Sequence, residues 1–410
     1  AAAAFLTDFA AMSAIGATES GGVHREAADP ADAATKQWLR EWLQQGGFEV
    51  RVDRIGNLFG LLTWTPGAPY VLLGSHLDSQ PAGGRFDGAY GVLAAAHTAA
   101  RLRDRFRGAD APPPLNIAVV NWFNEEGSRF QPSMMGSAVF TGKLDPDTAL
   151  DTCDAGGTSV RAALTDIGFA GTDECPELAS YAEIHVEQGS FLEQEGRTIG
   201  LVESNWAARK YRVSVHGEQS HTGSTPMTQR RDALYGAAKI VTAVRELADE
   251  FAEGVLHTSV GQLTVLPNSP VVVAREAQLH LDLRSADLDV LRTADTRLHE
   301  VFAQVRERAG VAVSLGTAHA WDIEPYQPAG VRLAEAAVEE LGLPHRRMLT
   351  LAGHDSTNMK DVVPTVMLFV PSAGGVAHNE FEHTDDADML AGVDVLTDVA
   401  DRLCHGEGQP

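Results

Sequence analysis

Side chains that can bind a divalent metal ion occur in five separate segments of this 410-residue chain, at positions 74–78, 84–88, 124–127, 183–187 and 376–379. Each segment offers imidazole or carboxylate groups, which suit zinc, manganese, cobalt or nickel. Each also follows an apolar run or lies beside glycine, where a strand end or a tight turn can place it. Together the segments predict a two-metal site of the kind that activates water for hydrolysis.

The first two segments contain His76, Asp78 and Asp87. Residues two apart on a strand share a face, so Asp78 can lie beside His76 and orient its ring. Asp87 precedes Gly88, which permits close backbone approach, and its carboxylate can bridge two ions. It can equally cap the helix that we predict from Ala89 onwards, and the sequence position leaves both interpretations open.

Glu125 and Glu126 directly follow a strongly apolar run. Two adjacent acids at the end of a buried strand repel each other unless a cation or a proton separates their roles. One can then bind metal while the other acts as a general base, although a solvated acidic turn is the alternative. His185 lies in an alternating strand pattern and His378 in a glycine-rich loop, where a lone histidine is more often structural than a ligand.

The elements that must position these residues follow an α/β pattern. Continuous apolar runs at 70–74 and 115–123 indicate strands that are buried on both faces. A predicted helix over 88–105 separates them, and this strand–helix–strand order predicts a mostly parallel sheet with helices outside it. The metal candidates follow the strands, and open α/β sheets place their sites at the carboxyl ends of strands.

The middle of the chain has a different pattern. We predict, in order, a strand at 210–216, a helix at 230–251, strands at 258–266 and 271–283, a helix at 288–308 and a strand at 311–315. This βαββαβ order predicts a ferredoxin-like α+β sandwich. The α/β pattern then resumes with a helix at 331–341, a strand at 365–370 and a helix at 386–404. We therefore predict a domain of residues 209–317 inserted into a discontinuous domain of residues 1–208 and 318–410.

The composition argues against two classes of binding partner and indicates a cellular compartment. Acidic residues exceed basic ones by 56 − 32 = 24, which argues against binding to nucleic acid or to an anionic membrane surface. The three cysteines, Cys153, Cys175 and Cys404, form no closely spaced pair, as is typical of a reducing compartment. Residues 1–6 are apolar but lack a basic leader, and no stretch predicts a membrane span, so we expect a cytoplasmic protein.

Eight motifs together resemble one known family. They are Gly-Ser-His-Leu-Asp-Ser (74–79), Gly-Gly-Arg-Phe-Asp-Gly (83–88), Glu-Glu-Gly-Ser-Arg-Phe (125–130), His-Val-Glu-Gln-Gly (185–189), His-Thr-Gly-Ser-Thr-Pro-Met (221–227), Leu-Asp-Leu-Arg (281–284), Ala-Gly-His-Asp (352–355) and Phe-Val-Pro-Ser (369–372). In order, and over almost the whole chain, they resemble the M20 metallopeptidase-related amidases of the hydantoinase/carbamoylase branch. That branch contains N-carbamoyl-L-amino acid hydrolases, metal-dependent β-ureidopropionases and allantoate amidohydrolases.

The resemblance implies two divalent ions in each subunit, with zinc first and manganese, cobalt or nickel as alternatives. It assigns five metal ligands, which are His76, Asp87, Glu126, His185 and His378. Asp87 would bridge the ions, while His76 and His185 would bind opposite ones.

The resemblance also assigns roles in the reaction. Glu125 would be the general base, Asp78 would support His76, and His221 would donate a hydrogen bond to the developing oxyanion. Without the resemblance, His221 would be interpreted as a turn histidine.

Four further residues are candidates for binding the substrate. Arg284 has a planar guanidinium that matches a carboxylate, although a surface ion pair with a nearby aspartate is the alternative. Asn268 and Gln188 carry amides suited to a ureido group. His354 is expected near the site in a role that stays open.

The expected partners are therefore a small ureido or amide substrate bearing a carboxylate, and a second copy of the chain bound through the inserted domain. We expect hydrolysis of an N-carbamoyl-L-amino acid or N-carbamoyl-β-alanine to amino acid, ammonia and carbon dioxide. Allantoate is the alternative substrate, because it too presents a carboxylate to Arg284. A peptidase or a metal-binding relative without turnover is less expected. Whether residues of the inserted domain serve their own or the neighbouring subunit stays open.

Overall fold

The computed structural model describes residues 2–108 and 111–408, which divide into two compact units. Unit 1 comprises Ala1–Ser204 and Pro325–Pro410, and unit 2 comprises Asn205–Glu324. Unit 2 is longer than the predicted 209–317 because its first strand begins at Ala207 and its last strand continues to Trp321.

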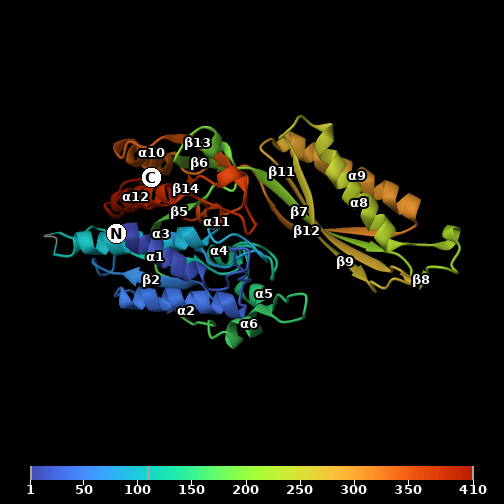
Figure 1. Cartoon of the computed structure of the whole chain (residues 1–410), viewed down its shortest axis with the longest axis horizontal. Helices are drawn as coiled ribbons and strands as arrows, with labels where there is room; N and C mark the ends of the chain where they lie inside the picture. The colour runs from blue at the N-terminus through green and yellow to red at the C-terminus, as the bar shows by residue number, and fades with distance from the viewer. Residues whose placement is uncertain (1, 109–110, 409–410) are drawn as a thin grey trace. The chain divides into compact units, whose positions relative to one another are not determined.

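Unit 1 is built around an eight-stranded sheet (Figure 1). Its strands are β1 (Glu49–Val52), β2 (Leu58–Leu62), β3 (Tyr70–His76), β4 (Asn116–Trp122), β5 (Leu178–Val186), β6 (Ile199–Asn205), β13 (His345–Thr350) and β14 (Thr365–Val370), in the spatial order β1-β2-β4-β3-β5-β14-β6-β13. The central strands β4, β3, β5 and β14 are parallel to one another. The pairs β1/β2, β2/β4 and β6/β14 are antiparallel. The expectation of a mostly parallel sheet therefore holds for the centre, and the outer strands make the sheet mixed.

Helices cover both faces of this sheet. One face packs against α1 (Ala2–Ser13), α2 (Pro30–Gln45), α3 (Ala89–Phe106), α10 (Pro328–Glu340) and α12 (Asp386–Cys404) in one large apolar core. The other face packs against α4 (Met135–Phe140) and α11 (Asp355–Met359). This double cover explains why β3 and β4 are apolar without alternation. Shorter helices are α5 (Pro146–Asp151), α6 (Val160–Asp166), α7 (Phe191–Gln194) and the 3-10 turn η3 (Ala373–Gly375).

Unit 2 contains an antiparallel four-stranded sheet in the order β12-β7-β11-β9. The strands are β7 (Ala207–His216), β9 (His257–Leu266), β11 (Glu276–Ser285) and β12 (Ala312–Trp321). The helices α8 (Ala233–Leu247) and α9 (Leu288–Ala309) share an apolar core with the sheet. Two short strands, β8 (Ser220–His221) and β10 (Val272–Val273), pair apart from it, and η1 (Met227–Gln229) and η2 (Ala248–Glu250) are 3-10 turns.

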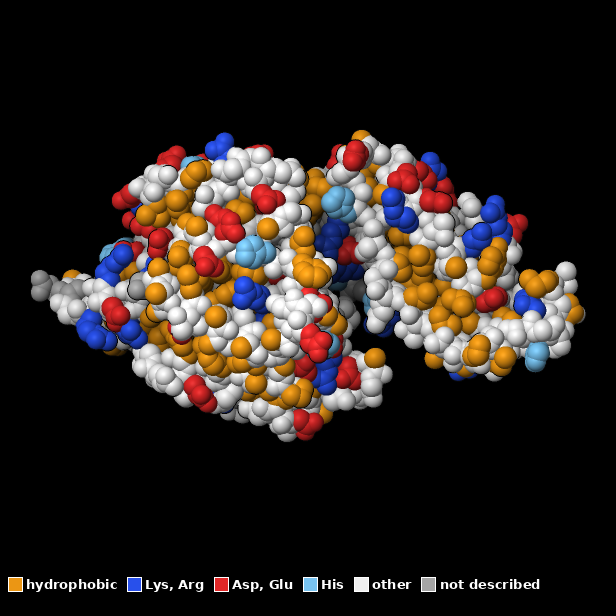
Figure 2. All heavy atoms as spheres, viewed as in Figure 1, with side chains coloured by type: hydrophobic (Ala, Val, Ile, Leu, Met, Phe, Trp, Pro, Cys, Tyr) orange, Lys and Arg blue, Asp and Glu red, His pale blue; other side chains and the backbone are white. Residues whose placement is uncertain are grey.

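The single strand predicted at 271–283 is divided into β10 and β11. Residues 271–274 are continuously apolar and 277–283 alternate, so the sequence suggests one long strand, but β10 pairs with β8 whereas β11 pairs with β7 and β9. Acidic side chains are spread over the visible surface of each unit rather than gathered in one patch (Figure 2). No helix among the described residues is long and apolar enough to cross a membrane.

Candidate metal centre and active site

The parallel centre of the sheet brings the five metal-ligand segments together. His76 is the last residue of β3, and His185 lies one residue before the end of the adjacent strand β5. Glu125 and Glu126 follow β4, and His378 follows β14. These four strands are neighbours and run in the same direction, so their carboxyl ends meet at one edge.

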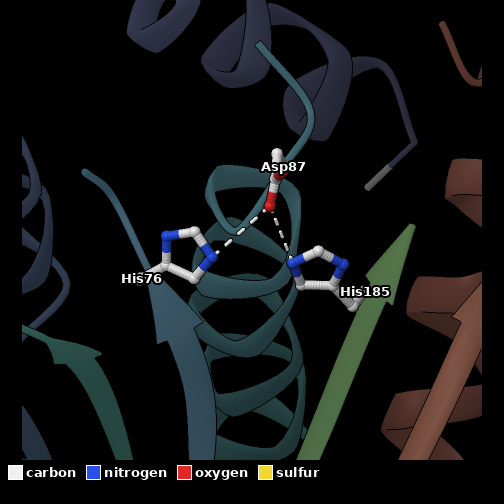
Figure 3. A group of neighbouring side chains, drawn as sticks. All are labelled: His76, Asp87 and His185. Carbon is white, nitrogen blue, oxygen red and sulfur yellow. Dashed lines mark ion pairs between the residues drawn. The ribbon is translucent and has the colours of Figure 1, made fainter. Parts of the chain in front are cut away.

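Asp87 occupies the middle of this edge and is buried. Its Oδ1 lies 3.4 Å from Nε2 of His76 and 3.0 Å from Nε2 of His185 (Figure 3). Its Oδ2 lies 3.3 Å from Nε2 of His378. The residue that caps α3 is Gly88, and no side chain caps the helix. The Asp87 carboxylate therefore faces three histidines instead of capping the helix.

Gly88 leaves the room that this arrangement needs. Its φ is 62°, and a Cβ at this position would lie 2.4 Å from atoms of the His76 ring. Its backbone N–H donates to Nε2 of His185 over 3.1 Å. Any side chain at position 88 would displace His76 and strain the backbone.

Backbone carbonyls orient the two buried imidazoles. Nδ1 of His76 lies 2.9 Å from the carbonyl oxygen of Asp78, and Nδ1 of His185 lies 2.8 Å from that of Val186. A carbonyl can only accept, so Nδ1 donates in each ring, which leaves Nε2, the nitrogen that faces Asp87, as the atom that could bind a metal ion.

This arrangement corrects one expectation for Asp78. Its carboxylate is 3.7 Å from Nδ1 of His76, so the carbonyl, not the side chain, orients the ring. The carboxylate instead accepts the backbone N–H groups of Glu125 and Glu126, each over 3.2 Å. Asp78 thus fixes the turn that carries both acids.

The donor atoms form two groups that share Asp87. One contains His76, Asp87 and His185, the other contains Asp87, Glu126 and His378, and the ligand atoms of each group lie within 4.8 Å of one another. His378 Nε2 is 3.3 Å from Glu126 Oε2. The expectation that His76 and His185 bind opposite ions is wrong, because β3 and β5 are adjacent and both rings reach the same oxygen of Asp87.

The charges at the centre favour a cation. Burial opposes a charge on His76, but Glu125, Asp87 and Asp78 raise its pKa well above the ordinary value. The pKa of His378 is raised to about 10, chiefly by Glu126. Burial likewise opposes a charge on Asp87, yet the histidines hold its pKa well below the ordinary range. Imidazole and carboxylate donors in such a field fit a divalent metal ion.

Glu125 lies beside the first group without belonging to it. Its Oε2 is 3.5 Å from Nε2 of His76, and the residue is only 7% exposed. Burial raises the pKa of Glu125 well above the ordinary value, and Asp355 adds to this while His76 opposes it. A carboxylate with a raised pKa is suited to take up and return a proton.

Two predicted substrate residues lie at the same edge of unit 1. Gln188 donates from Nε2 to Oδ2 of Asp87 over 2.7 Å. His354 is buried, and its ring centroid is 4.5 Å from that of His185. Glu382, which the sequence analysis missed, is also here and accepts the backbone N–H of Asp87 over 3.0 Å. Its position four residues after His378 is the only sequence feature that could have suggested it.

The other predicted residues belong to unit 2. His221 is exposed, and its Nδ1 accepts the N–H groups of Gly223 and Ser224 over 2.9 and 3.1 Å, which leaves Nε2 as a donor. Asn268 is exposed and has a φ of 54°. Arg284 pairs with Asp282, with 2.7 Å between Nη2 and Oδ2, as the ion-pair alternative anticipated.

Comparison with known proteins defines the class. The model of peptidase family M20/M25/M40 matches residues 72–402. A Mycolicibacterium smegmatis protein with only a general hydrolase name is 56% identical over 98% of this chain and 93% of its own. An N-carbamoyl-L-amino-acid amidohydrolase of Rhizobium meliloti is 35% identical over 94% of this chain and 92% of its own. Allantoate amidohydrolase of Escherichia coli is 33% identical over 94% of each chain.

A solved structure agrees in fold. A hydantoinase/carbamoylase family amidase from Burkholderia vietnamiensis superposes with a TM-score of 0.94 at 35% identity, and 98% of each chain is covered. The chain therefore belongs to the M20 family and, within it, to the hydantoinase/carbamoylase amidohydrolases, which act on C–N bonds other than peptide bonds.

Proposed function

We propose that this enzyme hydrolyses the ureido C–N bond of an N-carbamoyl-L-amino acid or of N-carbamoyl-β-alanine, using two divalent metal ions. The observation that carries the proposal is the sharing of Asp87 by two ligand groups, with Glu125 free beside one of them. Zinc is the first candidate, and manganese, cobalt and nickel suit the same donors.

The mechanism follows from the placement of the donors. Bound divalent ions would lower the pKa of a water molecule and polarise the ureido carbonyl. Glu125 accepts a proton as this water attacks the carbon, and then returns it to the departing nitrogen. The C–N bond breaks to release the amino acid and carbamic acid, which decomposes to ammonia and carbon dioxide.

The family resemblance suggests which residues hold the substrate in this proposal. Gln188 already points its amide at Asp87, and it would bind the ureido group together with Asn268. His221 would donate its Nε2–H to the oxyanion, and Arg284 would exchange Asp282 for the substrate carboxylate. The roles of the unit 2 residues rest on the family resemblance, as does the proposed homodimer.

Allantoate is the second candidate substrate. It is a ureido acid, and the Escherichia coli relative that acts on it is nearly as similar as the carbamoyl amino acid hydrolase. Its carboxylate would occupy the same position against Arg284.

The test is ammonia release by the metal-loaded enzyme from N-carbamoyl-L-amino acids, N-carbamoyl-β-alanine and allantoate, with amine release from a dipeptide as the control. We expect strong turnover of a carbamoyl amino acid. Turnover of allantoate alone would select the second candidate. Cleavage of the dipeptide with no ammonia from any ureido acid would overturn the proposal.

A further inference from the structure

The loop that carries Asp87 is held by a carboxylate from the far end of the chain. Glu382 lies in the loop after β14 and is only 4% exposed. Its Oε2 accepts the backbone N–H groups of both Phe86, over 3.1 Å, and Asp87, over 3.0 Å. These are the last two amides before the capping residue of α3, so Glu382 fixes the backbone from which the Asp87 side chain projects.

Gly84 makes room for this carboxylate. A Cβ at position 84 would lie 2.0 Å from Oε2 of Glu382 and 2.4 Å from its Cδ. The φ of Gly84 is not positive, so its backbone conformation does not require glycine. The close approach of Glu382 is therefore the reason that only a glycine fits here.

Keeping an acid at this position is costly by itself. Burial raises the pKa of Glu382 to about 8, and the nearby Asp87 adds to the effect. Oε1 is buried and has no hydrogen-bond partner among the described residues. The two N–H groups that Oε2 accepts offset part of this cost, because a carboxylate is a strong acceptor.

The same loop carries a metal-ligand candidate. His378 lies four residues before Glu382, its side chain is 50% exposed, and its φ is 51°. His76 and His185, by contrast, are buried and lie on strands of the sheet. The group of Asp87, Glu126 and His378 therefore depends on a loop, and Glu382 joins that loop to the backbone of Asp87 by hydrogen bonds.

We infer that Glu382 is a positioning residue that holds Asp87 and His378 in register, so that Oδ2 of Asp87 stays directed at the second metal-ligand group. The inference deepens the proposed function and rests on its two-metal centre. The position of Asp87 then depends on the hydrogen bonds of Glu382, so removal of the Glu382 side chain should weaken one metal site far more than the other.

Metal titration of the chelator-treated full-length protein with cobalt tests this inference. Binding is followed by calorimetry and by the cobalt absorption spectrum, which need no turnover. We expect Glu382→Leu and Gly84→Ala to weaken the second ion by about 10- to 100-fold, the usual effect of losing a group that orients a metal ligand. The first ion should lose much less affinity, because His76 and His185 are held on strands of the sheet.

Two further variants separate positioning from charge and from general damage. Glu382→Gln keeps an oxygen that can accept both N–H groups, so it should bind the second ion within a few-fold of the unchanged protein. Glu380 lies two residues earlier in the same loop, and its carboxylate accepts a hydrogen bond from the hydroxyl of Thr18. The Glu380→Leu protein is therefore the control and should bind both ions normally. Circular dichroism establishes that each variant is folded.

The other outcomes are also decisive. Equal weakening of both ions in the folded Glu382→Leu and Gly84→Ala proteins would mean a general structural role and overturn the inference. Unchanged binding of the second ion in these proteins would also overturn the inference. If Glu382→Gln weakened the second ion as much as Glu382→Leu, the second site would depend on the charge of Glu382 and not on its hydrogen bonds. If the unchanged protein bound fewer than two ions, the two-metal proposal itself would fail first.

Discussion

Glu125 and Glu126 are neighbours in sequence, yet their carboxylates face different partners. Glu126 lies 3.3 Å from His378 within a ligand group, whereas Glu125 lies beside His76 outside both groups. We predict that Glu125→Gln lowers turnover by about 100-fold or more while metal content is unchanged, because glutamine cannot take up the proton. Ammonia release and metal analysis measure the two effects.

The neighbouring acid supplies the matched control. Glu126→Gln should lose metal as well as activity, since it removes a charged ligand. Substantial turnover by the Glu125→Gln protein would remove Glu125 from the role of general base.

Side-chain types at this site could be predicted from sequence, but their pairing could not. Residue type and local position made His76, Asp87 and His185 candidates, but Asp87 and His185 each kept a structural alternative until the family resemblance assigned them as ligands. Their grouping depends on which strands are adjacent, and this depends on long-range pairing. The acceptor for the Asp87 amide, Glu382, comes from 295 residues away along the chain, so no local spacing indicates it.

Among the helices, α1, α2 and α3 meet at one histidine. Nε2 of His97 on α3 lies 2.9 Å from Oδ2 of Asp8 on α1, and the indole of Trp42 on α2 donates to the same oxygen over 3.0 Å. Burial lowers the pKa of His97, although Asp8 opposes this. As the pH falls, His97 therefore takes up its proton in the unfolded chain before it does so in the folded protein. The stability that comes from the neutral His97 in the fold is lost as the pH falls below about 6.5 towards the folded pKa.

We predict that His97→Gln reduces the dependence of stability on pH. Glutamine can still donate to Asp8 but does not titrate, so the free energy of unfolding should change less between pH 8 and pH 5 than in the unchanged protein. Urea unfolding at both pH values measures this. His299→Gln, on an exposed position of α9, is the matched control, and the effect of His97→Gln should exceed its effect. An identical pH dependence in the His97→Gln protein would contradict the prediction.

Long elements were predictable where local chemistry marks their ends. For the helix predicted at 288–308, the Asp287 side chain caps the first turn of α9 and Gly310 follows its last residue. The division of 271–283 into β10 and β11 was not predictable, because the pattern of apolar residues does not record a change of partner strand. Short helices such as α4 and α11 have too few turns for a periodic pattern.

At the scale of the whole molecule, the sheet of each unit has edge strands that pair with a neighbouring strand on one side only. In unit 2, β9 is an edge strand on which Leu263 is 43% and Leu266 is 39% exposed. In unit 1, β13 is an edge strand with Leu349 37% exposed. An apolar edge with unpaired backbone groups is a template for another strand. The proposed homodimer through the inserted domain would use β9.

We predict that Leu263→Asp converts the proposed dimer to single chains. In a twofold interface each subunit presents the same surface, so the substitution places a new charge on both sides of it, in a protein whose net charge is already −24. Light scattering coupled to gel filtration measures the mass. Leu349→Asp adds the same charge at the edge strand of the other unit and should leave the dimer intact. A dimeric mass for both variants would exclude β9 as the contact, and a single-chain mass for the unchanged protein would exclude the homodimer.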